Sequence, residues 1–368
     1  MPDYEFVTTD VFTDRRFGGN PLAVFPDARG LSDADMQALA REWNYSETTF
    51  VLPPADPAHT ARIRIFGPAH ELPFAGHPNV GTALVLAARM KAPPEVMLFE
   101  ELAGLVRVGL SMRDGAPMAT LEAPQVLQVG PEVPVPLLAA CAGVRPDQVL
   151  TGTHPPVVAS VGLGFAIAEV TPDALAGIVP DTGAFRRALA AAPSREGGFA
   201  LLAYCRDGDA VRARMFAPLA GIPEDPATGS AACALAGLLL SRTDLAGHRL
   251  TIRQGAEMGR PSLLHAHAAR TAGGIRAGVG GGGQAARPEP GADRSRRADP
   301  GAGGPQRRRR LRHGRRTPAH RPEYRRRPAA GRDPGRRPER GGTRLGAARA
   351  QGLRRRFPRV DCEVTAPR

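Results

Sequence analysis

Three ionisable side chains stand where they could move a proton. Glu47 lies among hydroxyl residues in "NYSETTF", His77 lies in "AGHPN", and Asp225 lies in "PEDPATGS". A carboxyl and an imidazole held close together can take a proton from carbon and return it elsewhere. Each residue alone also has an ordinary explanation, namely a solvated surface glutamate, a loop-packing histidine and an aspartate at a helix N-terminus. Spacing alone therefore does not decide between chemistry and structure.

An internal duplication raises these residues above the ordinary explanations. "RIRIFGPAHELPFAGHPNVGTALVLAA", residues 62–88, is repeated as "RARMFAPLAGIPEDPATGSAACALAG", residues 212–237. A long-period repeat of this kind indicates one structural unit used twice. The two copies place His77 and Asp225 at equivalent positions. The equivalent pairs are Arg62 and Arg212, Arg64 and Arg214, Phe66 and Phe216, Pro68 and Pro218, Gly81 and Gly229, and Thr82 and Ser230.

Each copy predicts a strand, a loop and a helix opened by a glycine and a hydroxyl residue. Gly81 and Thr82 would open the first helix, and Gly229 and Ser230 the second. Free N–H groups and the helix dipole make such an N-terminus a binding site for a carboxylate or phosphate. We therefore assign these four residues to substrate binding; helix capping, the ordinary explanation, is compatible with that role.

The elements that must position these residues predict two similar halves, residues 1–130 and 131–283. Both repeat helices are apolar on every side, which indicates burial on every side. We expect an α/β (α+β) fold in which each half is a curved sheet wrapped around its own helix. Facing each other across a pseudo-twofold axis, the halves would bring His77 opposite Asp225. Strands are expected at 4–12, 15–25, 46–54, 62–66, 96–102, 105–110, 118–124, near 157, at 165–170, 199–205, 212–216, 250–255 and 275–279, with further helices at 33–43, near 138 and 174, and at 183–191.

Residues 284–368 differ in character from the rest of the chain. They hold 26 arginines, no lysine and 8 acidic residues, a net charge of +18, whereas residues 1–283 carry −5. Such an Arg/Pro/Gly-rich segment cannot bury enough apolar surface to offset its ordering entropy, so we expect a disordered tail. Its onset at a poly-glycine run suggests the hypothesis of a frameshift product. The alternative is an arm that binds nucleic acid through its arginines.

The remaining signals predict a soluble, cytoplasmic protein. The four cysteines show no paired spacing, which favours neither disulfides nor a zinc site. No apolar run reaches the 18 residues of a membrane span, and the N-terminus has no signal-peptide pattern. His265 and His267 share one face of a strand, but no third ligand accompanies them, so we expect no metal. Cys233 is expected in the core.

Five stretches resemble the phenazine-biosynthesis PhzF-like isomerase/epimerase family: "DVFTDRRFGGNPLAVF", "NYSETTFVLP", "ELPFAGHPNVGTA", "GIPEDPATGSAACAL" and "IRQGAEMGRPS". The resemblance implies a diaminopimelate epimerase-like fold with the active site between two halves. It also implies catalytic roles for Glu47, His77 and Asp225. Substrate-binding roles follow for Gly76, Gly229 and Ser230, and we add Asn20 from the matching Gly-Gly-Asn-Pro turn. Two departures are an "FGP" where the family more often has threonine before proline, and the absence of the family's C-terminal strand after Gly283.

The resemblance implies a cofactor-independent isomerase, expected as a homodimer, that acts on a small carboxylate like trans-2,3-dihydro-3-hydroxyanthranilate. Glu47 would remove a proton from the hydroxyl-bearing carbon, and the same group, or His77 and Asp225 with it, would return a proton elsewhere on the ring. Two alternatives stay open. One is an epimerase or racemase of an amino-acid-like anion, although neither repeat loop holds the cysteine of a two-cysteine racemase. The other is a non-catalytic binding protein with a nucleic-acid-binding tail.

Overall fold

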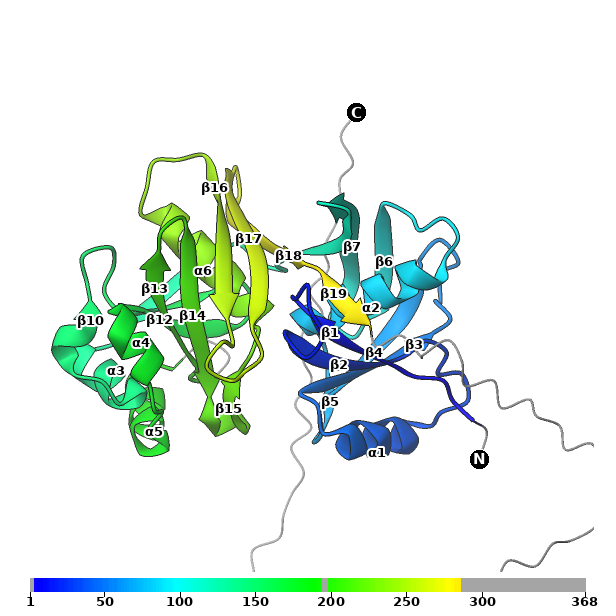
Figure 1. Cartoon of the computed structure of the whole chain (residues 1–368), viewed down its shortest axis with the longest axis horizontal. Helices are drawn as coiled ribbons and strands as arrows, with labels where there is room; N and C mark the ends of the chain where they lie inside the picture. The colour runs from blue at the N-terminus through cyan, green and yellow to red at the C-terminus, as the bar shows by residue number, and fades with distance from the viewer. Residues whose placement is uncertain (1–2, 194–197, 286–368) are drawn as a thin grey trace, which may run out of the picture. The chain divides into compact units, whose positions relative to one another are not determined.

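Two helices, α2 (Gly76–Arg89) and α6 (Gly229–Ser241), are each enclosed by a curved sheet (Figure 1). The computed structural model describes residues 3–193 and 198–285, which fall within one compact unit, residues 1–294. The predicted tail, 284–368, therefore lies outside the described residues apart from Gln284 and Ala285. Each repeat supplies the strand that leads to one central helix, as the duplication predicts.

The first sheet surrounds α2. β1 pairs with β2, β2 with β3, β3 with β4, β4 with β6, β6 with β7 and β7 with β8; the β2–β3 and β4–β6 pairs are parallel and the others antiparallel. The elements are β1 Val7–Val11, β2 Asn20–Phe25, α1 Asp33–Trp43, β3 Glu47–Leu52, β4 Ala61–Phe66, β5 Glu71–Leu72, α2, β6 Val96–Glu101, β7 Gly104–Arg113 and β8 Ala116–Glu122.

The second sheet surrounds α6. β9 pairs with β11, β11 with β12, β12 with β13, β13 with β14, β14 with β16 and β16 with β17. The elements are β9 Gln128–Glu132, α3 Val135–Ala142, η1 Pro146–Gln148, β10 Val149–Leu150, β11 Val157–Ser160, β12 Gly164–Val170, α4 Pro172–Gly177, α5 Thr182–Ala191, β13 Leu201–Asp207, β14 Ala210–Ala217, η2 Pro218–Ala220, β15 Ile222–Asp225, α6, β16 Gly247–Gln254, β17 Ser262–Thr271, β18 Gly274–Gly281 and β19 Gly283–Ala285.

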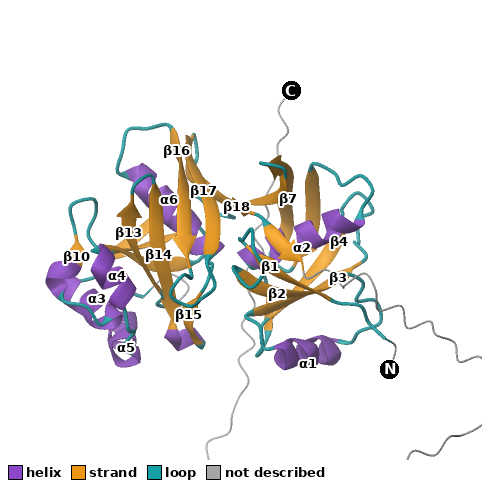
Figure 2. Ribbon diagram, in the orientation of Figure 1, coloured by secondary structure: helices purple, strands orange, loops and turns teal. Residues whose placement is uncertain are grey.

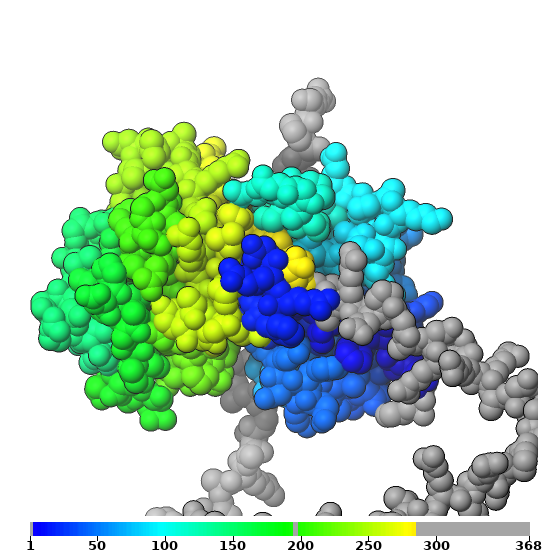
Figure 3. All heavy atoms as spheres, in the orientation of Figure 1, coloured from blue at the N-terminus to red at the C-terminus, as the bar shows by residue number. Residues whose placement is uncertain are grey.

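The last strands join the two sheets. β18 pairs with β17 on one side and with β8 of the first half on the other, and β19 continues directly to pair with β1. Figure 3 shows dark-blue residues of the N-terminal segment beside yellow residues of the C-terminal segment. β19 continues past Gly283, so the sequence-based expectation that no strand remains after Gly283 is wrong for Gln284 and Ala285. The β1–β19 register fixes Val11 opposite Gly283.

The outer helices cover the outside of the sheets (Figure 2). α1 packs on Phe25, Phe50 and Phe66 of the first half, and α3, α4 and α5 pack on the outer face of the second. Ser32 caps α1 through a capping box with Asp35, and the helix begins at Asp33 as the sequence predicts. None of the helices within the described ranges is long and apolar enough to cross a membrane.

The start of α2 differs from the prediction. The helix begins at Gly76, five residues before the expected Gly81, whereas α6 begins at Gly229 as expected. Pro78 falls in the first turn of α2, where its missing N–H has no helical partner to lose. Gly81 is a packing glycine inside the helix, because a Cβ there would lie 2.6 Å from side-chain atoms of Leu22 and Val11.

The repeated arginines are structural. Arg64 pairs with Glu71 at 2.7 and 2.6 Å, and Arg214 pairs with Glu224 at 2.8 Å through both contacts. Each guanidinium also lies over the phenylalanine two residues along its strand, about 5 Å from the ring centre. The alternating Arg–x–Phe pattern therefore builds the same brace in both halves. Arg214 also donates to three carbonyls at the end of α4, those of Leu175, Ala176 and Ile178.

Candidate active site

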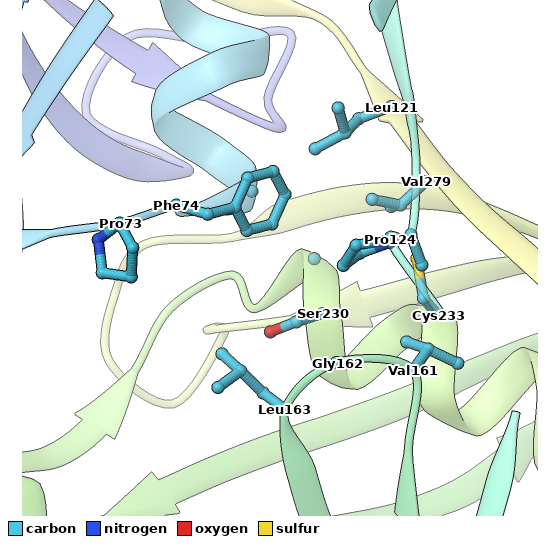
Figure 4. Close-up of a pocket in the computed structure, with 13 residues that line it drawn as sticks. Pro73, Phe74, Leu121, Pro124, Val161, Gly162, Leu163, Ser230, Cys233 and Val279 are labelled. Atoms are coloured by element: carbon cyan, nitrogen blue, oxygen red, sulfur yellow. The ribbon is translucent and has the colours of Figure 1, made fainter. Parts of the chain in front are cut away.

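The N-termini of α2 and α6 meet at a pocket of about 180 Å³ (Figure 4). Gly76 stands close to the second helix, since a Cβ on it would lie 3.9 Å from the backbone nitrogen of Ser230. Neither helix has a side-chain cap or an acidic residue in its first turn, in contrast to α1. Two N-termini that are left without a capping carboxylate can bind an anion together.

The rest of the pocket is apolar. In Figure 4 the Ser230 hydroxyl points into the space between Phe74 and Leu163. None of the lining side chains is charged, so the pocket fits a small molecule with one anionic group and an apolar body. The lining residues are Pro73, Phe74, Gly76, Leu121, Ala123, Pro124, Val161, Gly162, Leu163, Gly229, Ser230, Cys233 and Val279.

The three predicted acid/base residues converge directly beside this pocket. His77, which follows the pocket residue Gly76, places Nε2 3.4 Å from Oε2 of Glu47. Their side chains are 7% and 14% exposed. Asp225 is 8% exposed, and its charge interacts with both His77 and Glu47. The structure thus brings a carboxyl from β3, an imidazole from α2 and a carboxyl from β15 into one buried group.

Burial sets the ionisation of this group. Desolvation raises the pKa of Glu47, with a hydrogen bond from Ser46 opposing it. Desolvation raises the pKa of Asp225 to about 6, opposed by the charge of His77. Burial lowers the pKa of His77 to about 4, although Asp225 favours its charged form. Perturbed ionisable groups that converge in this way are typical of sites of proton transfer. At neutral pH His77 is therefore a neutral imidazole.

A hydrogen-bond network holds Asp225 in place. Asn20 Nδ2 donates to Asp225 Oδ1 at 2.9 Å, and the Thr228 hydroxyl donates to Oδ2. Gln254 Nε2 donates to the Asp225 carbonyl at 2.7 Å and to Thr228 Oγ1 at 3.1 Å. Because Asn20 begins β2 in the first half and Asp225 ends β15 in the second, this network also ties the halves together at the site.

Glu47 is fixed by the first sheet. It begins β3, where the parallel register places it beside Leu22 of β2. Its neighbour Ser46 donates to Asn20 Oδ1 at 3.3 Å, and Asn20 in turn donates to Asp225, so this asparagine links the start of β3 to Asp225. His77 Nε2 and Glu47 Oε2 are buried and have no hydrogen-bond partner of good geometry. Each atom therefore keeps an unused hydrogen-bonding site.

Three residues assigned to substrate binding do not reach the pocket. Gly81 and Thr82 lie inside α2 rather than at its N-terminus, and the Thr82 hydroxyl is 2.9 Å from that of Thr49 in the core. Asn20 is fully buried and uses its amide hydrogens on Asp225 and the Ala227 carbonyl. Its place in the structure is that of a positioning residue. Gly76, Gly229 and Ser230, by contrast, line the pocket as the assignment requires.

Sequence reasoning missed Thr228 and Gln254, which hold Asp225. Thr228 follows Asp225 by three residues, which is the spacing of a local side-chain hydrogen bond and a signal that could have identified it. Gln254 carries no such signal, because only the pairing of β14 with β16 brings it close. Cys233 is buried as predicted, but it also lines the pocket.

Metal binding has no evident place in the part of the chain that the structure describes. Residues 3–193 and 198–285 contain no group of three or more His, Cys, Asp or Glu side chains arranged to hold a metal ion. His267 Nε2 instead lies 2.8 Å from Oε1 of Glu122 on the neighbouring half. The absence of a cofactor stays a prediction.

Comparison with known proteins identifies the family. The model of the PhzC-PhzF family, described as phenazine biosynthesis-like protein, matches residues 9–287. The chain belongs to this family. An uncharacterized isomerase of Mesorhizobium japonicum is 39% identical over 277 residues, which cover 72% of this chain and 90% of the relative. The trans-2,3-dihydro-3-hydroxyanthranilate isomerase of Pseudomonas aeruginosa is 37% identical over 270 residues, with the same coverage. The protein is thus an isomerase of the PhzF type.

A solved structure agrees on the fold. The phenazine biosynthesis protein of the PhzF family from Bacillus anthracis superposes with a TM-score of 0.71, covering 78% of this chain and 98% of its own, at 22% identity. The predicted diaminopimelate epimerase-like architecture, two halves that each enclose a central helix, is confirmed.

Proposed function

We propose that this isomerase moves a proton on a small cyclic carboxylate of the trans-2,3-dihydro-3-hydroxyanthranilate type. The observation that carries the proposal is the contact between Glu47 and neutral His77 beside two uncapped helix N-termini. The relatives named for this reaction in Pseudomonas support the substrate class. The reaction needs no electron donor or acceptor, because it moves one proton and shifts double bonds within one molecule.

The first step is proton removal by Glu47. Its ionised carboxylate takes a proton from the carbon that bears the substrate hydroxyl, and the electron pair enters the conjugated ring. Burial raises the pKa of Glu47 and so makes the carboxylate a stronger base than a solvated one. The substrate carboxylate binds the N–H groups at Gly76, Gly229 and Ser230, which direct the ring towards Glu47.

The second step returns a proton to another ring carbon. Glu47 can deliver it directly, or His77 and Asp225 can relay it, since the imidazole lies next to Glu47 and interacts with Asp225. A neutral imidazole can accept a proton at one nitrogen and donate from the other. Positioned transfer of this kind contributes about 10²–10⁴-fold in rate.

The apolar lining of the pocket suits a carbon ring. Its lining side chains are apolar apart from Ser230, which fits the ring of the proposed substrate. A racemase that uses two cysteines as its acid/base pair needs both at the site, whereas among the described cysteines Cys233 alone lines the pocket. These observations favour isomerisation over epimerisation of an amino-acid-like anion.

The test uses the full-length protein in deuterium oxide with trans-2,3-dihydro-3-hydroxyanthranilate. We expect turnover with deuterium incorporation into the product carbon. Glu47→Gln should lose turnover by about 10²–10⁴-fold and keep binding of the carboxylate. Glu132→Gln, the same change at an exposed position in β9, is the matched control and should behave as the parent.

Failure of the folded parent to turn over this compound would refute the proposed substrate class. Equal deuterium incorporation by Glu47→Gln would refute the role of Glu47. The cytoplasmic location and the homodimer stay predictions from the sequence, as does nucleic-acid binding through residues 284–368.

A further inference from the structure

The loop that joins β16 to β17, residues 255–261, begins beside Asp225. Gln254, the last residue of β16, donates to the Asp225 carbonyl at 2.7 Å. Gly255 follows, and a Cβ on it would lie 2.6 Å from the carbonyl oxygen of Pro226. The loop therefore starts in close contact with the backbone that carries Asp225.

The end of the loop reaches the first half of the molecule. The Pro261 carbonyl accepts a hydrogen bond from Gly19 N at 3.1 Å. Gly18 also lies against it, because a Cβ on Gly18 would stand 2.7 Å from the same carbonyl oxygen. Since Asn20 is the next residue of the chain, the loop ends beside the backbone that carries Asn20.

Arg260 fastens this end of the loop. Its Nε donates to the Gly19 carbonyl at 2.8 Å, and its Nη2 donates to the Gly18 carbonyl at 2.9 Å. The same Nη2 also donates to Asp10 Oδ1. The Gly19 carbonyl belongs to the peptide group that joins Gly19 to Asn20, so the guanidinium holds the backbone at Asn20 itself. A planar guanidinium directs several donors in a fixed fork, which an ammonium on a flexible stem does not reproduce.

Backbone hydrogen bonds keep the two ends of the loop together. The Gly255 carbonyl accepts from Met258 N at 3.2 Å and from Arg260 N at 3.0 Å. Gly259 N donates to the Ala256 carbonyl at 3.0 Å. The loop is therefore one short, closed unit whose first residues contact the Asp225 segment and whose last residues contact the Asn20 segment.

We propose that Arg260 is a positioning residue that holds Asn20 where its amide can donate to Asp225. Asn20 Nδ2 reaches Asp225 Oδ1 at 2.9 Å, and Gln254 approaches Asp225 from the opposite end of the same loop. Arg260 is not among the residues that line the pocket, so it acts through Asn20 and not on the substrate. The inference rests on the proposed function in giving Asp225 a part in proton transfer.

Removal of the guanidinium should misplace Asn20 and leave the anion-binding pocket in place. The hydrogen bonds of the Arg260 side chain go to residues 10–19 and not to the N-terminus of α2 or α6. A misplacement of about 1 Å can cost about 10²-fold in rate. Arg260→Met should therefore lower kcat by about 10- to 10²-fold. A purely structural role would lower the melting temperature and leave the kcat of the folded protein unchanged.

The first measurement follows the Asn20 amide itself in the full-length protein. The chain contains three asparagines, Asn20, Asn44 and Asn79, so labelling asparagine with ¹⁵N in the side-chain amide gives a simple NMR spectrum. Asn20→Ala identifies the signals of Asn20, because they disappear. In Arg260→Met the hydrogen exchange of this amide should be about tenfold faster than in the parent, because a charge-assisted anchor is lost.

Arg260→Lys provides a second variant should Arg260→Met fail to fold. It keeps the positive charge beside Asp10 but loses the fork of donors that spans two carbonyls. The Asn20 amide should exchange faster than in the parent, by less than in Arg260→Met. A parental exchange rate in Arg260→Lys together with a parental rate in folded Arg260→Met would overturn the inference.

Arg212→Met is the matched control. Arg212 Nη2 donates to Glu257 Oε1 at 3.0 Å, so this arginine fastens the same loop to β14 of the second half instead of to the segment before Asn20. Its kcat and the exchange of its Asn20 amide should match the parent. Equal changes in Arg212→Met and Arg260→Met would show a general effect of loosening the loop and would overturn the inference.

The second measurement is a double-mutant cycle on kcat with trans-2,3-dihydro-3-hydroxyanthranilate. If Arg260 acts through Asn20, Arg260→Met should add little to the loss already caused by Asn20→Ala. Additive losses would contradict the proposal. The Kd of anthranilate, an aromatic carboxylate of the proposed size, should stay within about twofold of the parent in Arg260→Met. A larger change would place the effect of Arg260 in binding and would also overturn the inference.

The exchange of the Asn20 amide does not depend on turnover. A failure of the proposed function would therefore appear separately, as an absence of isomerisation by the parent while Arg260→Met still frees the Asn20 amide.

Discussion

The two copies of the repeat build the same scaffold but deliver different side chains to the site. In the first copy the helix begins at Gly76 and carries His77 in its first turn. In the second copy the helix begins only at Gly229, and the equivalent residue, Asp225, ends the short strand β15. The two copies thus present an imidazole from the first turn of a helix and a carboxyl from the end of a strand, because the helix starts five residues later in the second copy. The duplication brings the two side chains together, and the different helix starts place them on different kinds of backbone.

The braces beneath the site show the same relation. Arg64 and Arg214 each pair with a glutamate and lie over a phenylalanine, but the second is more buried, 8% against 14% exposed. Arg64 reaches outward to Asp33 at the start of α1, whereas Arg214 reaches inward to the last carbonyls of α4. The two equivalent arginines therefore make different additional contacts and should contribute unequally to stability.

The largest expected effect is on catalysis, when Asp225 or His77, the residues at equivalent positions of the two copies, is replaced. Asp225→Asn keeps the size of the side chain but removes its charge from beside His77. We expect kcat to fall by about 10²–10⁴-fold while the pocket still binds a carboxylate. His77→Asn, the counterpart in the first copy, should give a loss of similar order if the two residues act as one relay. Steady-state kinetics of both single variants and the double variant would check this, and additive losses would argue against a shared relay.

The same Asp225 variant has a signature in stability. Burial raises the folded-state pKa of Asp225 from its usual 3.8 to about 6. At this residue the folded state therefore holds more protons than the unfolded state between these values, so the contribution of Asp225 to the free energy of unfolding should fall as pH rises from about 4 to 6 and then level off, while the lowered pKa of His77 contributes a rise over the same range. Asp225→Asn should remove the falling contribution, so the free energy of unfolding of the variant should gain on that of the parent as pH rises through this range, which thermal melts at each pH would measure. An unchanged slope would contradict the raised pKa.

The next largest expected effect is a difference in stability loss when Arg64 or Arg214 is replaced. Arg214→Met leaves Glu224 without its partner in a largely buried place and frees three carbonyls, so we expect a loss of about 3–5 kcal/mol. Arg64→Met should cost less, about 1–3 kcal/mol, because its surroundings are more exposed. Urea unfolding of the two variants measures the difference. Equal losses would show that the extra contacts of Arg214 contribute nothing.

The paired glycines should separate packing from binding. Gly81→Ala drives a methyl group against Leu22 and Val11 and should cost about 1–3 kcal/mol of stability. The Cβ added by Gly229→Ala would lie 3.1 Å from a side-chain atom of Val279 in the pocket wall. Its main effect should therefore be weaker binding of a carboxylate ligand. Thermal melts and ligand titrations on both variants distinguish these outcomes. A normal Kd for Gly229→Ala would remove that residue from the anion site.

The smallest effects are expected at the paired hydroxyls. Ser230→Ala should raise KM with little change in stability, because the hydroxyl points into the pocket. Thr82→Val should cost about 1 kcal/mol through its lost hydrogen bond to Thr49 and leave KM unchanged. Kinetics and melts on the two variants test whether these equivalent residues have truly separate roles. A raised KM in Thr82→Val would restore the sequence-based assignment.

Much of this arrangement could be predicted from sequence because it depends on local patterns. Ser32 marks the start of α1, the apolar helices mark the two cores, and the repeat brings His77 to Asp225. The rest depends on packing that no local pattern records. Gly81 is a glycine because Leu22 and Val11 press on it, and Gln254 reaches Asp225 only through strand pairing.

The shared strand β18 and its continuation β19 have a consequence for the order of folding. β1 finds its outer partner only in Gly283–Ala285, and β8 finds one in the strand just before. During synthesis β1 and β8 of the N-terminal half therefore each keep one unpaired edge until the residues up to 285 have left the ribosome. Contacts this distant in sequence are slow to form. A nascent chain halted before β18 should expose those edges to chaperones. The pairing of β18 and β19 with them ends the stage at which the chain is prone to aggregate.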